Sequence, residues 1–130
     1  MNTLSVIILL SLALPLSAAS WKAGTAKADI TPNSPIWMAG YGGRTKPSEG
    51  ALHPLWAKAL ALEDAKDNRA VIVSTDTLGI TAGIYNNLKV RLAKEYKLQP
   101  AQIMLNASHT HTGPVLRGGL YDIYPLTAAH

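Results

Sequence analysis

The sequence predicts an α/β fold: a partial mixed sheet with a β-hairpin followed by a βαβ crossover. Two observations lead to this prediction. Two apolar runs of strand length, the second of them β-branched, flank a polar turn, and a helix-period segment lies between the second run and a third. A strand, a helix and another strand in this order favour a right-handed crossover between two parallel strands.

The chain begins with an apolar segment that is typical of a secretory signal peptide. Residues 4–16 are mostly Leu, Ile, Val and Ala, and the small residues Ser17-Ala18-Ala19-Ser20 follow. A membrane-spanning helix needs roughly 20 apolar residues, whereas this run is shorter and contains Pro15. We therefore expect a signal peptide over residues 1–19 and a secreted or periplasmic protein. An uncleaved anchor is the alternative.

Composition limits what residues 20–130 can be. Their number suffices for one small domain with a modest core. The absence of Cys excludes disulfides, thiolate zinc ligands and a Cys nucleophile. The net charge is +4, and the densest basic group lies on the predicted helix at Lys89, Arg91, Lys94 and Lys97. Because no aromatic platform accompanies this group, it indicates a solvated helix face, and we expect no nucleic-acid partner.

The first half of the chain is predicted to be loop and hairpin. Residues 21–56 hold five Gly and four Pro, which favours turns and extended loop around a single strand over Thr25–Ile30. A strand over 56–62, a polar turn and a strand over 70–74 then form the hairpin. The β-branched side chains of the second hairpin strand predict that it is buried on both faces.

One amphipathic helix follows the hairpin. Thr81 is a suitable N-cap, and apolar residues recur every four positions after it: Ile84, Leu88, Leu92 and Tyr96. Leu98-Gln99-Pro100 ends the helix. Residues 102–107 are then predicted to form another buried strand, parallel to the strand over 70–74.

Polar residues follow both strands of the predicted crossover. Ser74–Thr77 follow the first strand, and Ser108–Pro114 follow the second. Ligand sites in parallel α/β sheets lie beyond the carboxyl ends of the strands. We therefore expect Asp76 and His109 to lie at the same edge of the sheet, where they mark the candidate site.

His109 and His111 are the candidate metal-binding and catalytic residues. Residues two apart in extended backbone project to the same side, and imidazole suits zinc. A catalytic zinc typically takes three protein ligands and a water, so these two side chains cannot complete the set. Either other parts of the protein contribute, or one His binds the metal while the other acts on substrate or water.

Four segments occur in an order and spacing that match a known family: Ala23–Pro32, Met38–Arg44, Ser74–Asp76 and Ala107–Pro114. Together they resemble the N-terminal part of the neutral/alkaline non-lysosomal ceramidase family, over residues 22–117. The most specific element is His-Thr-His followed by a hydroxyl residue, Gly and Pro. Within the second segment, Gly40-Tyr41-Gly42 either brings backbone close to substrate or forms a simple turn.

The resemblance implies an amidase that cleaves the N-acyl bond of ceramide, or of a related lipid amide, with one zinc held by two His, a Glu and a Tyr. It implies that His109 is the first zinc ligand and that His111 is a catalytic residue beside the zinc. His53 is a further catalytic candidate, although its spacing to the residues around Lys58 departs from the family pattern; a loop His is the alternative. The other ligands belong to later parts of the family domain.

We therefore expect this chain to be a truncated portion of a larger domain, inactive alone, whose lipid substrate brings it to a membrane surface. Zinc lowers the pKa of a water ligand to about 7, and His111 would orient that water or pass a proton to the leaving amine. Asp76 would accept a hydrogen bond from the second ring N–H of His109, or cap the turn after its strand.

Two alternatives stay open. One is a secreted domain without catalysis, in which the His pair is incidental. The other is a zinc hydrolase that acts on another ester or on a phosphoester, because His-x-His at a strand end recurs in unrelated metal enzymes. The oligomeric state is also left open.

Overall fold

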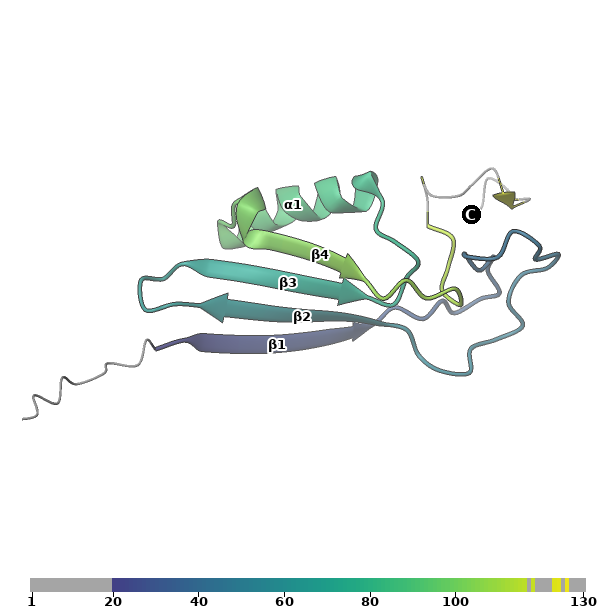
Figure 1. Cartoon of the computed structure of the whole chain (residues 1–130), viewed down its shortest axis with the longest axis horizontal. Coiled ribbons are helices and arrows are strands. Elements are labelled where there is room, and N and C mark those ends of the chain that lie inside the picture. The colour runs from purple at the N-terminus through teal and green to yellow at the C-terminus, as the bar shows by residue number, and fades with distance from the viewer. Residues whose placement is uncertain (1–19, 117, 119–122, 125, 127–130) are drawn as a thin grey trace, which may run out of the picture.

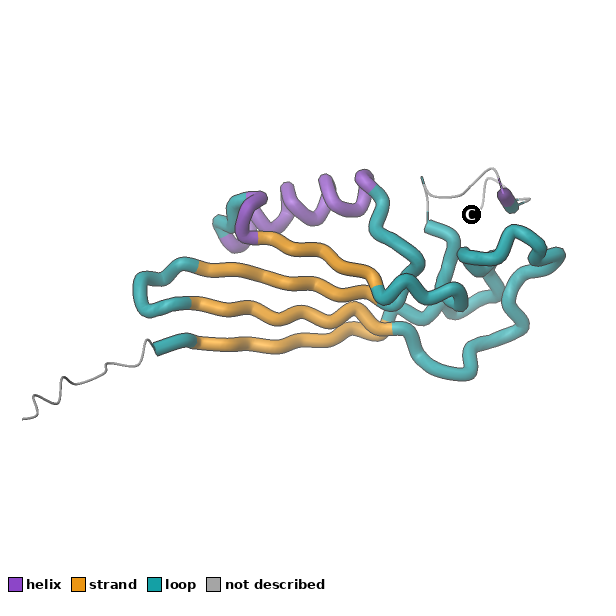
Figure 2. The backbone as a smooth tube through the Cα atoms, viewed as in Figure 1, coloured by secondary structure: helices purple, strands orange, loops and turns teal. Residues whose placement is uncertain are grey.

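The computed structural model describes residues 20–116, 118, 123, 124 and 126; the predicted signal peptide over residues 1–19 lies outside them. Six elements follow along the chain (Figure 1): β1 (Lys22–Asp29), β2 (Trp56–Glu63), β3 (Arg69–Thr75), α1 (Ala82–Tyr96), the short 3-10 helix η1 (Pro100–Gln102) and β4 (Ile103–Ala107). A long loop joins β1 to β2 and extends beyond one end of the sheet (Figure 2).

The four strands form one mixed sheet in the order β1-β2-β3-β4. β2 pairs antiparallel with both β1 and β3, while β3 and β4 run parallel. The predicted hairpin and βαβ crossover are thus confirmed. β1 begins three residues earlier than the sequence predicts, because Lys22 pairs with Glu63 and their side chains form a 2.7 Å ion pair.

The hairpin turn between β2 and β3 is organised by Asp64. Its carboxylate accepts hydrogen bonds from the side chain and backbone N–H of Asn68 at 2.8 and 2.9 Å, and from the backbone N–H of Lys66 at 2.8 Å. These donors hold the pKa of Asp64 below its ordinary value of 3.8. The local chemistry of a polar turn therefore sets the register of the central strand pair.

Helix α1 begins at the predicted N-cap and ends at Tyr96, just before the predicted stop at Leu98–Pro100. The Thr81 hydroxyl accepts a long hydrogen bond of 3.5 Å from the backbone N–H of Ile84. At the other end Lys97 is left-handed, with φ of 60°, and its N–H donates to the Ala93 carbonyl. Within the described part of the chain, no helix has the length and apolar character that a membrane crossing requires.

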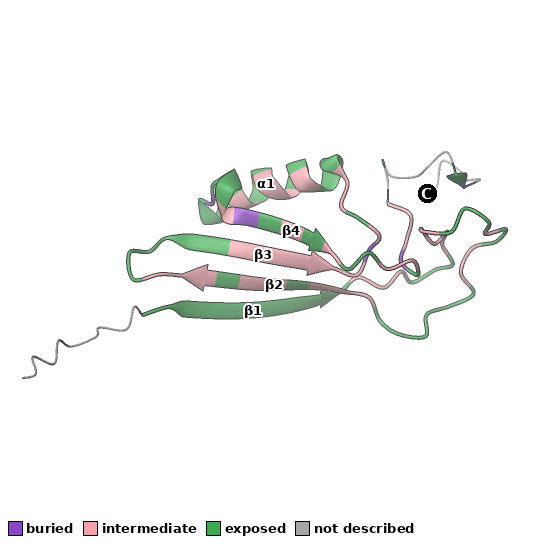
Figure 3. Cartoon of the chain, in the orientation of Figure 1, coloured by how far each residue is buried: buried purple, intermediate pink, exposed green. Residues whose placement is uncertain are grey.

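The strands are less buried than the sequence predicts: the strand over 70–74, predicted to be buried on both faces, is at most half-buried, and in the predicted buried strand over 102–107 only Ile103 is buried among the described residues. Ile103 is 9 % exposed but its neighbour Met104 is 61 % exposed, and β3 is half-buried from Val71 to Thr75 (Figure 3). In β4 the exposure alternates along the strand, because successive side chains point to opposite faces of a sheet; α1 lies next to β4 and does not extend across β1 or β2 (Figure 1).

A second group of tightly buried residues lies in the loops beyond the sheet. Trp37, Ala39 and Tyr124 are 7 %, 3 % and 5 % exposed. The rings of Trp37 and Tyr124 are 5.9 Å apart in a tilted arrangement. These contacts anchor the β1–β2 loop beneath the segment that follows β4, which is the segment that carries His109 and His111.

Candidate active site

The carboxyl ends of β3 and β4 bring the two polar segments together. Thr75 and Ala107 form the last pair of the parallel ladder, and the backbone N–H of Ser108 donates to the Thr75 carbonyl at 2.9 Å. Asp76 and His109 therefore follow neighbouring strand ends at one edge of the sheet, as predicted. Gly113 brings the chain back to this edge, because a Cβ there would lie 3.0 Å from the Asp76 carbonyl oxygen.

The β1–β2 loop supplies a third segment to the same edge. Met38 forms an antiparallel bridge with Pro114. The backbone N–H of Ala39 donates to the Gly113 carbonyl, and that of Val115 donates to the Trp37 carbonyl, both at 2.9 Å. Residues 37–44 consequently lie against the loop that carries the His pair, although some seventy residues separate the two in sequence.

His109 is held by its backbone conformation and by one ring nitrogen. Its φ of 58° is left-handed, a conformation that is uncommon for residues other than Gly and that concentrates at functional sites. Nδ1 lies 2.8 Å from the Leu78 carbonyl oxygen. A neutral ring that donates from Nδ1 presents the lone pair of Nε2. His109 also lines a pocket of about 400 Å³ together with Leu78, Thr81 and Leu116.

Asp76 does not take the place that the sequence predicts for it. Its Oδ2 accepts a 2.9 Å hydrogen bond from the backbone N–H of Trp56, and its own N–H donates to the Trp56 carbonyl at 2.9 Å. The carboxylate therefore ties the end of β3 to the start of β2. The acceptor that faces His109 Nδ1 is the Leu78 carbonyl instead, so the expected contact between Asp76 and His109 is corrected.

His111 sits between two aromatic rings and a glycine. Its ring centroid is 5.2 Å from that of His109 and 4.8 Å from that of Tyr41, both in edge-on arrangements. Gly40 has φ of +103°, and a Cβ at this position would lie 2.4 Å from His111 Cγ. The backbone of Gly40 therefore lies directly against the His111 side chain.

Arg44 binds the backbone of the segment Ser108–Pro114, which carries the His pair and is called the His loop below. Its Nη2 donates a 2.6 Å hydrogen bond to the His111 carbonyl, and its guanidinium carbon lies 5.2 Å from the Tyr41 ring centroid. Arg44 Nε and His111 Nδ1 are both buried, with no hydrogen-bond partner among the described residues. The sequence places Arg44 in a matching segment but assigns it no role, because its contact is made to backbone across the fold.

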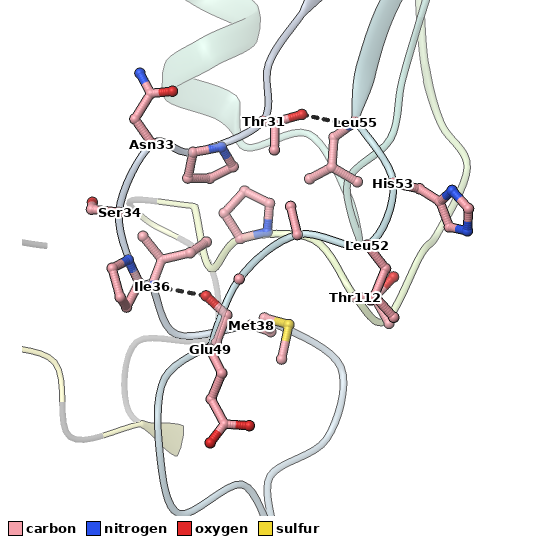
Figure 4. Close-up of a pocket in the computed structure, with 16 residues that line it drawn as sticks. Thr31, Asn33, Ser34, Ile36, Met38, Glu49, Leu52, His53, Leu55 and Thr112 are labelled. Carbon is pink, nitrogen blue, oxygen red and sulfur yellow. Dashed lines mark hydrogen bonds between the residues drawn. The ribbon is translucent and has the colours of Figure 1, made fainter.

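His53 lies apart from the His pair. It lines a second pocket, together with Thr112 and Pro114, whereas His109 lines the first; Pro114 borders both. Figure 4 shows the exposed His53 ring directed away from the second pocket. In the part of the chain that the structure describes, no three His, Asp or Glu side chains gather closely enough to hold a metal ion.

The sequence and the fold match one protein family. Residues 21–127 match the family model described as neutral/alkaline non-lysosomal ceramidase, N-terminal. The chain belongs to this ceramidase family. A neutral ceramidase of Pseudomonas aeruginosa is 32 % identical over 128 residues, and that of Drosophila pseudoobscura pseudoobscura is 32 % identical over 124 residues. These alignments cover 92 % and 90 % of this chain.

Solved ceramidase structures share the fold. The crystal structure of neutral ceramidase from Pseudomonas aeruginosa superposes with a TM-score of 0.69 at 31 % identity, over 75 % of this chain. A structure described as ceramidase complexed with C2 gives a TM-score of 0.65 at 31 % identity. This chain spans 19 % and 17 % of the two relatives above and 16 % of the solved ceramidase chains. It corresponds to the N-terminal region of the ceramidase domain.

Proposed function

We propose that the complete gene product is an exported, zinc-dependent amidase that hydrolyses the N-acyl bond of ceramide, or of a related lipid amide, to a sphingoid base and a fatty acid. In this proposal His109 is the first metal ligand and His111 is a catalytic residue beside the metal. Membership of the ceramidase family supports the reaction class. This chain spans less than a fifth of the length of the Pseudomonas relative. We therefore propose that later parts of the protein supply the remaining zinc ligands.

The observation that carries the zinc proposal is the hydrogen bond between His109 Nδ1 and the Leu78 carbonyl, at 2.8 Å. A His that binds a metal through one nitrogen almost always donates its other N–H to a carbonyl or carboxylate, which fixes the tautomer and the ring orientation. His109 is arranged in this way, with Nε2 as the nitrogen left for a metal. The donor chemistry therefore fits one ligand of a zinc site.

When bound, zinc supplies a Lewis acid that polarises the amide carbonyl and activates water. The chain itself contributes orientation and proton transfer. Because Nδ1 of His111 is buried against Gly40, Nε2 is the nitrogen from which His111 exchanges a proton. A neutral imidazole suits this task near neutral pH, first as a base toward water and then as an acid toward the leaving amine.

We also propose that the reaction takes place at a lipid surface, because the proposed substrate is a lipid amide that the protein would meet at a membrane. One solved relative is described as complexed with C2. Export agrees with the apolar N-terminal segment over residues 4–16. Detection of the protein outside the cytoplasm, with an N-terminus at Ser20, is the expected result; a retained residue 1 in the exported form would favour an anchor.

The test uses the complete gene product with a fluorescent ceramide. We expect release of labelled fatty acid, loss of this activity after a chelator removes metal, and recovery on addition of zinc. A fluorescent phosphodiester assayed in parallel separates the amidase from a phosphoesterase. A protein that contains no metal, or that retains full turnover without it, would refute the zinc proposal; one that cleaves only the phosphodiester would refute the substrate class.

A further inference from the structure

The larger of the two pockets described above lies in the β1–β2 loop, and the reaction proposed above does not use it. Its volume is about 700 Å³, which falls within the range of sites that bind small molecules. Two parts of the β1–β2 loop, residues 31–38 and 48–55, line the pocket and are called its two limbs. Several apolar lining residues come from these limbs and from the His loop: Pro32, Ile36, Met38, Leu55 and Pro114. The pocket therefore offers an occupant mainly van der Waals contact.

Hydrogen bonds join the two limbs at both ends of the pocket. At one end, the backbone N–H of Ile36 donates to the Ser48 hydroxyl at 3.0 Å, and the Ser48 N–H donates to the Ile36 carbonyl at 2.8 Å. At the other end, the Leu55 N–H donates to the Thr31 hydroxyl at 2.8 Å, and the Leu55 carbonyl accepts from Ile30 at 2.9 Å. The walls are therefore preformed, and these backbone groups are already satisfied.

The polar side chains at the rim are directed away from the pocket. Figure 4 shows the Glu49 carboxylate, the His53 ring and the Asn33 amide pointing outward, while the Leu55 side chain points between the two limbs. Together with the satisfied backbone, this arrangement leaves few groups that could bind a polar ligand. An apolar ligand has the lowest desolvation cost on entering such a pocket, because it leaves no buried polar group without a hydrogen-bond partner.

The pocket is continuous with the His loop. Thr112, which directly follows His111, and Pro114 both line it. Pro114 also lines the pocket that contains His109. A ligand seated between the limbs would thus end beside the His pair, where the bond to be cleaved is expected.

We propose that this pocket binds one hydrocarbon chain of the lipid amide and so selects substrates by chain length. The inference rests on the proposed amidase function and adds a specificity site to it. The pocket holds the chain by apolar contact while Thr112 and Pro114 position the adjoining polar part of the lipid at the His loop. The N-acyl chain and the sphingoid chain share this chemistry, and substrates that vary one chain at a time distinguish them.

The experiment compares Ile36→Trp with Lys46→Trp in the complete gene product. Trp at position 36 fills the pocket from its wall, whereas Trp at position 46 adds the same ring to an exposed position of the loop that does not line the pocket. For Ile36→Trp we expect kcat/KM to fall on the order of tenfold or more for long-chain ceramides and to stay within about twofold for short-chain ones. Lys46→Trp should leave both values unchanged within about twofold.

A second variant protects the test against misfolding. Ile36→Ala removes apolar contact without adding bulk, so it should lower kcat/KM for long-chain substrates by a smaller factor and spare short-chain ones. Equal losses for all chain lengths in Ile36→Ala, or no loss in either variant at position 36, would overturn the inference. If wild-type protein does not hydrolyse even short-chain ceramide, the proposed function itself fails, which is a distinct outcome.

Discussion

Gly40 and His111 are in direct contact, and the contact requires glycine. A Cβ built on Gly40 would lie 2.4 Å from Cγ and 2.6 Å from Nδ1 of His111, and the φ of Gly40 is +103°. Any other residue would have to displace the imidazole and adopt a backbone conformation that L side chains rarely take. The position of the proposed catalytic ring thus depends on a residue some seventy positions earlier.

Gly40→Ala should therefore move the His111 ring and lower turnover. A displacement of about 1 Å costs on the order of a hundredfold in rate when it misplaces a reacting group, and we expect a loss of that size in kcat for the complete gene product. Metal content should be unchanged, because His109 is anchored separately on Leu78. Gly43→Ala is the matched control, since a Cβ there meets nothing within 4 Å. Equal losses in both variants would contradict this assignment.

His109→Ala and His111→Ala should separate metal binding from catalysis. We expect the first variant to abolish zinc retention, because it removes a direct ligand, and the second to retain zinc while turnover falls. The measurements are zinc per chain by atomic emission and kcat on fluorescent ceramide, both on the complete gene product. Equal zinc loss in the two variants would mean that the division of roles is wrong.

Arg44→Ala should loosen the His loop. Its 2.6 Å hydrogen bond to the His111 carbonyl is a charged one, of a kind that contributes about 1.5–3 kcal/mol. We expect kcat to fall roughly tenfold and Arg44→Lys to recover part of the loss. The control is Lys46→Ala, which removes an exposed cation of the same loop whose 2.6 Å ion pair with Glu49 is local. A turnover equal to that of the control would show that Arg44 does not support the site.

The 130-residue chain alone should not hydrolyse ceramide, even with added zinc. Its described residues contain no group of three side chains that could hold a metal ion, and a catalytic zinc typically needs three protein ligands. The measurement is release of sphingoid base from ceramide by the purified chain, with the complete gene product as positive control. Zinc-dependent release by the chain alone would contradict our assignment of missing ligands to later sequence.

The hairpin turn should lose order in acid. Hydrogen bonds from Asn68 and Lys66 lower the pKa of Asp64 from 3.8, so the stabilisation is complete well above 3.8 and is lost as the pH falls through the lower, folded-state pKa. Deuterium uptake by residues 63–69 should be faster in Asp64→Ala than in wild type at neutral pH. The two proteins should converge in strong acid; a difference that persists unchanged there would rule out the carboxylate as the cause.

Local patterns were sufficient to predict the four strands, helix α1 and their order, although not the short helix η1. The turn around Asp64, the cap at Thr81 and the break at Pro100 are short-range signals, and each lies where the structure ends or begins an element. The parallel pairing of β3 with β4 followed from the helix between them, because crossover handedness leaves few alternatives. The same parallel pairing predicted that Asp76 and His109 lie together at the carboxyl ends of these two strands.

Burial and hydrogen-bond partners were not accessible in the same way. β-branched residues occur in half-buried as well as buried strands, so the run over 70–74 could not reveal that β3 is only half-buried from Val71 to Thr75. Likewise, a carboxylate near a His in sequence is a plausible acceptor, but the acceptor for His109 is the carbonyl of Leu78. Every residue carries such a carbonyl, and only the path of the chain selects one.

The sequence by itself determined the mixed sheet, the crossover and the family, through periodicity, turn chemistry and the segment from Ala107 to Pro114. Tertiary structure alone decided that Asp76 accepts a hydrogen bond from the start of β2 and that Gly40 and Arg44 contact His111. It also decided that His53 lines a different pocket from His109. The physical reason is the range of the interactions involved. Strands, turns and caps depend on residues a few positions apart, whereas these contacts join loops that meet only after the sheet has formed.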